Sequence, residues 1–189
     1  MISSSKNTSL FSAKIPTLHL LILILLFVMA LGLRLYQIDE PPMDFNPIRQ
    51  YHSAILARGF YEELLYGETE SVPPDSIVEP PILEGIASLA YYAVGSEQLW
   101  IPRLLSAVFW MVGGVFLYLI AQKIAFPAAG VVSLVFYLFT PLSILPSRAL
   151  QPDPLMVMAL LITLFAILRY HEQPSGISSP ESSITRMVK

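Results

Sequence analysis

Long runs without charge dominate the chain. No charged residue occurs between Lys14 and Arg34, or between Arg103 and Lys123, and each interval holds 19 residues. A helix of that length rises about 28 Å, which is close to the thickness of the hydrocarbon core of a bilayer. The two runs therefore predict membrane-spanning helices. These spans are residues 15–33 and 104–122.

Two more apolar runs follow the second predicted span. Residues 124–147 carry no charge, and Pro141 and Pro146 predict that this helix kinks or ends near Thr140. The next run is shorter and crosses only if Arg169 extends its side chain to the interface. The corresponding spans are residues 124–141 and 154–169.

The whole pattern predicts an all-α integral membrane protein with about four transmembrane helices and two short interfacial helices in a long first outer loop. A cleaved signal peptide is the alternative interpretation of the first run. A serine- and proline-rich composition predicts a disordered tail. The predicted organisation is a cytoplasmic N-terminus at 1–14, a transmembrane domain at 15–172, outer loops at 34–103 and 142–153, and a cytoplasmic tail at 173–189.

The first outer loop contains two helical patterns. Asn46 and Pro47 are typical of an N-cap followed by proline at the first helical position, and Gly67 ends the pattern. Proline also opens the second pattern, at Pro80 and Pro81, and its 14 or 15 residues are too few to cross a bilayer. The first helix has an apolar stripe at a spacing of four, which includes His52, Leu56, Phe60 and Leu64.

Composition and charge narrow the class further. Hydrophobic residues make up 54% of the chain and charged residues 13%, with a mean hydropathy of +0.62 and no cysteine. A net charge of −3 leaves no basic surplus for a nucleic-acid partner. A cytoplasmic N-terminus would put all four lysines on the inner side, which predicts a multi-pass inner-membrane protein in that orientation.

Candidate chemistry lies in the outer loops. Asp44 precedes the first loop helix, and Arg49 and Gln50 lie in its first turn, where free helix-end amides can add to a phosphate site. The alternative is a simple ion pair between Asp44 and Arg49 that stiffens the loop. Glu79 and Glu84 are further candidate acids, and Glu84 also fits a partner of the helix dipole.

The second outer loop ends in an acid at the predicted mouth of the fourth span. Asp153 either has a functional role there or forms an interfacial ion pair with Arg148. If Asp44 and Asp153 met, two carboxylates would repel each other unless a cation or a proton lay between them.

Several segments, in order, resemble bacterial GT-C membrane glycosyltransferases of the aminoarabinose-transferase and protein-mannosyltransferase-like branch. The resemblance covers roughly residues 15–172 and, beyond it, such enzymes are longer and cross the membrane more often, so the chain resembles an amino-terminal portion. The segments are 42–50, 53–61, Glu79-Pro80-Pro81, 99–106 and 147–156.

The resemblance implies a polyprenyl-phosphate sugar as donor, membrane lipid around the site, and sugar transfer on the outer side of the membrane. It implies a base or acceptor-positioning role for Asp44, with His52 as a second candidate because many relatives carry their acid in that motif. It also implies phosphate binding by Arg49, Gln50 and Arg103. By the same resemblance, Asp44 and Asp153 would hold Mg²⁺ or Mn²⁺.

Two alternatives stay open at this point. The chain can be a non-catalytic membrane subunit or scaffold, or a transport component for lipid-linked sugars. A split transferase would have the missing remainder of the enzyme as its partner. Loss of transfer on neutralising Asp44 would distinguish the enzyme from both alternatives.

Overall fold

The computed structural model describes residues 17–67 and 79–172, and the elements in these ranges are all helices. The predicted segments 1–14 and 173–189 lie outside the described residues. The seven helices are α1 (Thr17–Leu35), α2 (Pro47–Tyr66), α3 (Ile82–Val94), α4 (Trp100–Ile124), α5 (Pro127–Phe139), α6 (Pro141–Ser147) and α7 (Asp153–His171).

Three of these helices, α1, α4 and α7, are long and apolar enough to cross a membrane. A fourth span exists if α5 and α6 are taken as one, although they are bent by 62°. The bend lies at Thr140, whose extended backbone is the conformation that a residue before proline prefers. The prediction of an all-α membrane protein with about four spans is confirmed.

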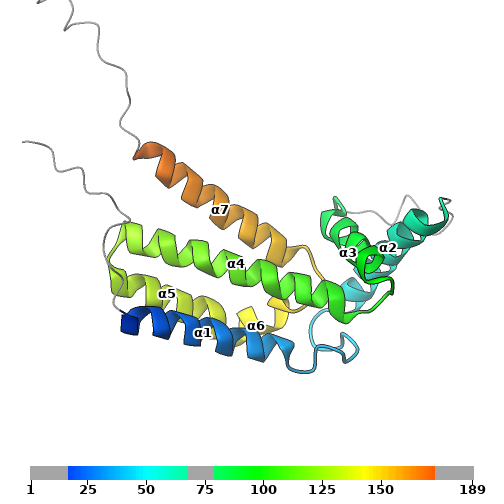
Figure 1. Cartoon of the computed structure of the whole chain (residues 1–189), viewed down its shortest axis with the longest axis horizontal. Helices are drawn as coiled ribbons and strands as arrows, with labels where there is room; N and C mark the ends of the chain where they lie inside the picture. Colours follow the sequence, from blue (N-terminus) through cyan, green and yellow to red (C-terminus); the bar gives the residue numbers. More distant parts are fainter. Residues whose placement is uncertain (1–16, 68–78, 173–189) are drawn as a thin grey trace, which may run out of the picture.

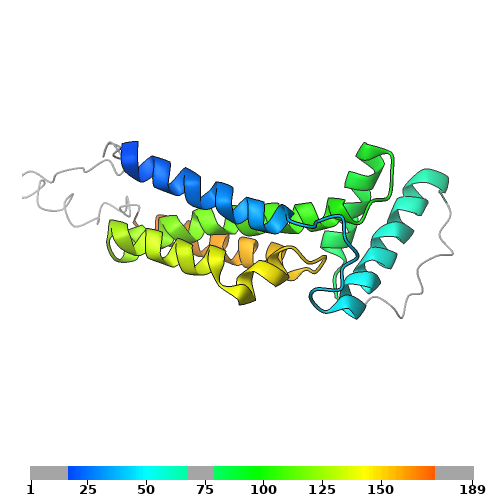
Figure 2. The ribbon, with the colours of Figure 1, turned by 90° about the horizontal axis from the view of Figure 1, so that it is seen from below.

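The helices form a bundle with a two-helix extension at one end (Figures 1 and 2). The central helix α4 contacts α1, α3, α5, α6 and α7. α2 and α3 pack on each other beyond the end of the bundle where α1 ends and α7 begins. The α4–α5 turn and the end of α7 lie at the opposite end. The described residues between α1 and α4, 36–67 and 79–99, are therefore gathered at one end of the molecule.

The start of α4 differs from the sequence prediction. The helix begins at Trp100 rather than at residue 104, so Arg103 belongs to its first turn and not to the loop. Pro102 does not prevent this, because amide groups in the first turn of a helix have no intrahelical partner to lose. The earlier start brings the Arg103 guanidinium inside the bundle, where it is 1% exposed.

The two helices of the first loop also differ in detail from the pattern. Asn46 has a left-handed backbone and makes no side-chain capping bond, whereas Gly67 ends α2 with φ 75° as expected. The predicted apolar stripe is only partly used, because Leu64 is 47% exposed. α2 instead buries small side chains such as Ala54 and Ala57, which allow α3 to approach closely.

The bundle core lies between α1, α4 and α5, where Trp110 stacks on Tyr137 with ring centroids 4.5 Å apart. Gly113 lies next to this pair. A Cβ atom there would come within 2.6 Å of the Tyr137 hydroxyl and within 3.5 Å of the Met158 Cα on α7. The glycine thus sets how closely α5 and α7 pack on α4.

Replacing Gly113 with valine should destabilise the bundle by about 1–3 kcal/mol, because the branched side chain overpacks the α4–α5–α7 contact. The free energy of unfolding in mixed detergent micelles, followed by circular dichroism, measures the change. Gly32→Val on α1 is the matched control, because a Cβ at Gly32 meets nothing within 4 Å. Equal losses in both variants would contradict the prediction.

Candidate functional site

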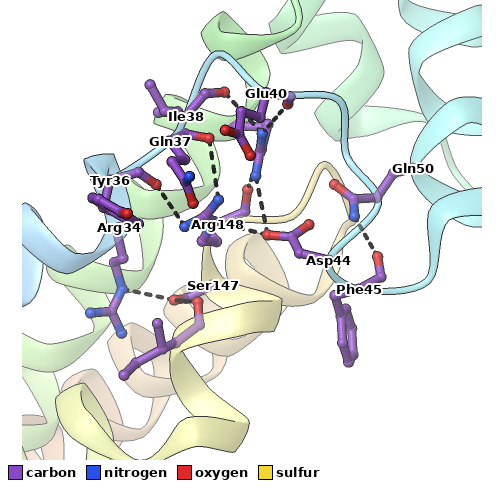
Figure 3. Close-up of polar contacts among 12 residues, drawn as sticks. Arg34, Tyr36, Gln37, Ile38, Glu40, Asp44, Phe45, Gln50, Ser147 and Arg148 are labelled. Atoms are coloured by element: carbon purple, nitrogen blue, oxygen red, sulfur yellow. Dashed lines mark hydrogen bonds and ion pairs between the residues drawn. The ribbon is translucent and has the colours of Figure 1, made fainter.

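A buried arginine from α4 holds the first loop against the bundle. Arg103 donates from Nη1 to the carbonyl oxygens of Ile38 (2.9 Å) and Glu40 (2.7 Å), and from Nε to that of Arg148 (3.3 Å). Its Nη2 donates to Oδ2 of Asp44 at 3.2 Å (Figure 3). These contacts direct its guanidinium to the backbone and to one carboxylate.

A second arginine reaches the same carboxylate from the connection between α6 and α7. Arg148 Nε lies 3.0 Å from Oδ2 of Asp44, as an ion pair without hydrogen-bond geometry. Its terminal nitrogens donate to the carbonyl oxygens of Tyr36 and Gln37 at 2.8 and 3.3 Å. Figure 3 shows Arg148 beside Asp44, and Arg103 bonds the same oxygen. One oxygen therefore joins the first loop, α4 and the second loop.

Two further buried side chains strengthen this junction. Arg34, at the end of α1, donates to Ser147 Oγ at 2.7 Å and to the carbonyl oxygens of Ala30 and Leu138. The amide of Gln50 donates to the carbonyl oxygen of Phe45 and accepts from the Leu150 backbone amide at 3.1 Å. The first turn of α2 is thereby bonded to the second outer loop.

These contacts correct two of the ion pairs considered from the sequence. Asp44 pairs with Arg103 and Arg148, not with Arg49. Asp153 lies 3.7 Å from Arg49 rather than pairing with Arg148. The reason is that the loop after α1 folds back over the start of α4, while the first turn of α2 faces the start of α7.

A cavity of about 600 Å³ lies between α2, the start of α3 and the second outer loop. It is lined by a mixture of apolar and ionisable side chains. The lining residues are Asn46, Pro47, Ile48, Arg49, His52, Ser53, Leu56, Glu79, Glu84 and Pro152. Cavities of this size and composition suit small ligands or parts of larger ones.

Arg49 carries the accessible positive charge of this cavity. Its Nη2 bonds both carboxylate oxygens of Glu79 at 2.9 and 3.0 Å, and its Nη1 faces Asp153. All three side chains are at least 40% exposed. Exposed ion pairs of this kind contribute about 1 kcal/mol or less, so an incoming anion can replace a carboxylate at Arg49 at small cost.

The structure thus separates the site residues that the sequence proposed. Arg49, His52 and Glu79 line the cavity. Asp44, Gln50 and Arg103 do not line it but belong to the junction beside it, and Gln50 and Arg103 are almost fully buried there. Asp153 meets the cavity only through Arg49.

The donor groups do not fit a divalent cation. Within residues 17–67 and 79–172, no three histidine, aspartate or glutamate side chains gather in a way that could hold a metal ion. Asp44 and Asp153 also belong to different ion pairs, and each already faces a guanidinium group. No step of the chemistry is therefore assigned to Mg²⁺ or Mn²⁺.

The surroundings of Arg148 and Glu84 differ from those that the sequence suggested. Arg148 appeared as a possible partner of Asp153, and nothing in its neighbours pointed to Asp44. Glu84 was interpreted as a dipole partner, yet it is 5% exposed and lines the cavity. A signal did exist for Glu84, because it shares its helix face with Ala87 and Tyr91 at i+3 and i+7, which are both buried.

Comparison with known proteins supplies the family. Residues 78–178, more than half of the chain, match the family described as dolichyl-phosphate-mannose-protein mannosyltransferase. The chain belongs to this family, whose members are membrane glycosyltransferases of the GT-C type. The matched region includes α3 to α7 and begins after Asp44 and Arg49. No curated protein and no solved structure matches the chain.

Asp44→Asn should lower the free energy of unfolding by about 3 kcal/mol, because it leaves two buried guanidinium groups without their shared anion. Titration of the purified protein with SDS in mixed micelles measures this change. Asp153→Asn provides the control and should cost less than about 1 kcal/mol, since its ion pair is exposed. An Asp44 variant as stable as the control would show that the junction does not depend on this carboxylate.

Proposed function

We propose that this chain takes part in sugar transfer from a polyprenyl-phosphate donor to an acceptor on the outer side of the membrane. The observation that carries the proposal is the cavity at one end of the bundle, with Arg49 at its accessible face. Membership of the GT-C family supports it, because such a family suggests a lipid-linked sugar as the donor.

The reaction needs few protein groups. The bond between the anomeric carbon and the phosphate oxygen breaks, the acceptor oxygen or nitrogen forms a new bond to that carbon, and its proton passes to a base. Arg49 would bind the phosphate and stabilise its charge as it leaves. In this proposal His52, which lines the same cavity, accepts the proton, and Asp44 serves the junction that holds α2 and the second loop in position.

The exposed sides of α1 and α7 provide an apolar surface along which a long lipid tail can lie. Both helices bury little of their surface and expose large apolar side chains, as helices in contact with lipid do. A polyprenyl chain can therefore lie in the bilayer while its phosphate reaches the cavity. Only the headgroup needs a polar site.

The orientation is part of the proposal. The α4–α5 turn, with Lys123 in the last turn of α4, lies at the end away from the cavity, and the end of α7 with Arg169 lies there too. Basic residues favour the cytoplasmic side. The cavity would then open on the outer side, where lipid-linked donors are used in the class that the sequence resembles.

Purified chain should bind radiolabelled polyprenyl-phosphate mannose saturably, and Arg49→Ala should weaken binding about tenfold or more, because a charged hydrogen bond to phosphate is lost. Glu79→Gln should have the opposite effect on donor binding. It removes the carboxylate that competes for Arg49, so it should strengthen binding several-fold. Absence of binding to the wild type, or binding that is indifferent to both changes, would count against the donor site.

Labelling of single cysteines tests the orientation, and the chain has no native cysteine to interfere. A membrane-impermeant maleimide should label Tyr66→Cys, at the end of α2, in intact cells. It should label Phe126→Cys, in the α4–α5 turn, only after the cells are opened. Both positions are exposed, so labelling of each after lysis is the control. The reverse pattern would place the cavity in the cytoplasm.

A further inference from the structure

Glu84 and Glu79 both line the cavity, but only Glu79 has a partner for its carboxylate. Glu84 lies in the first turn of α3, is 5% exposed, and forms no hydrogen bond or ion pair within the described residues. Several neighbouring acids differ in this respect. Those with an arginine partner are Asp44, Glu62, Glu79, Glu97 and Asp153.

Most of the Glu84 side chain is enclosed, but its oxygens are not among the fully buried atoms that lack a hydrogen-bond partner. The carboxylate therefore opens on the cavity, and a group in the cavity can bind it. The N-terminus of α3 offsets part of a negative charge there, as the dipole interpretation requires. It does not explain why the side chain lines a cavity, since an acid that only balances a dipole can stay in solvent.

The walls of the cavity indicate what kind of group would satisfy Glu84. Ser53, which is 4% exposed, and His52 come from α2, and Pro47, Leu56 and Pro152 add apolar surface. A few polar groups set in apolar walls are typical of small-molecule sites, in which the polar groups orient the ligand. The faces of a sugar ring can pack on the apolar walls while its hydroxyl groups reach the polar ones. A carboxylate is the natural acceptor for such hydroxyl groups, because charged hydrogen bonds are the stronger kind.

The cavity wall therefore offers groups of opposite charge. Arg49 presents an exchangeable cation, and Glu84 presents an acceptor on a side chain that is 5% exposed. A sugar joined to a phosphate matches both, with the phosphate at Arg49 and the ring hydroxyls at Glu84. A lipid phosphate without its sugar would match only Arg49.

We propose that Glu84 determines sugar recognition in this cavity by accepting hydrogen bonds from hydroxyl groups of the donor's sugar. This inference rests on the proposed function, because it takes the lipid-linked sugar as the ligand. It assigns the phosphate and the sugar to different residues, which makes the two assignments separable by experiment.

The experiment compares two probes, radiolabelled polyprenyl-phosphate mannose and polyprenyl phosphate without the sugar, bound to the full chain in detergent. Glu84→Gln should weaken binding of the mannose-bearing lipid about tenfold and leave binding of the sugar-free lipid unchanged. Arg49→Ala should weaken binding of both. Glu97→Gln is the matched control and should change neither, because Glu97 pairs with Arg58 and does not line the cavity.

The outcomes separate the two proposals. If the wild type bound neither lipid, the proposed function would fail, and the inference on Glu84 with it. If the wild type bound both and Glu84→Gln weakened neither, or weakened both equally, the donor site would stand and the role of Glu84 in sugar recognition would be overturned. Should Glu84→Gln fail to fold, Glu84→Asp carries the same test, because it keeps the charge and withdraws the carboxylate from the sugar.

Discussion

The arrangement of this molecule depends on one carboxylate oxygen shared by two buried arginines. Asp44 Oδ2 lies 3.2 Å from Arg103 and 3.0 Å from Arg148, and the remaining donors of both guanidiniums are directed mainly to backbone carbonyl oxygens. An unpaired charge at the end of a membrane bundle is expensive, so the shared anion stabilises both arginines in their buried places. The first loop, the start of α4 and the connection before α7 are therefore held together, and the position of α2 follows from that junction.

Hydropathy and proline positions were sufficient to predict the spans, but α6 (Pro141–Ser147) lies mostly in what was predicted as the outer loop 142–153. Each span is an uninterrupted apolar run, and the break at Thr140 follows from the effect of Pro141 on the residue before it. These signals are local, which is why they can be read from a single sequence. The buried face of α2 was harder to predict, since Ala54 and Ala57 are buried by close approach to α3 rather than by their hydrophobicity.

The partners of the charges could not be predicted in the same way. Asp44 is five residues from Arg49 but pairs with arginines 59 and 104 positions further along the chain. Nearness in sequence suggests Arg49 as the partner of Asp44, but the actual partners depend on how the loop after α1 folds back over the start of α4. Glu84 shows the converse case, in which a local interpretation as a dipole partner was available but did not predict that the side chain lines the cavity beside α2.

The charged residues fall into two groups by burial: the enclosed ion pairs of Asp44 and the exposed ion pairs of Arg49. The ion pairs of Asp44 are mostly enclosed, so removing one partner would leave a buried charge unpaired. These residues are therefore suited to holding the loops rather than to exchanging ligands. The contacts of Arg49 are exposed and weak, so its carboxylate partners can give way to a phosphate without disturbing the fold. In the proposed function, ligands would exchange at Arg49 and Glu84 while the junction beside them stays constant. The two kinds of arginine are far apart along the chain, but the contacts of Gln50 with Leu150 and of Arg49 with Asp153 bring them to the same end of the molecule, so the rigid junction lies next to the exchangeable site.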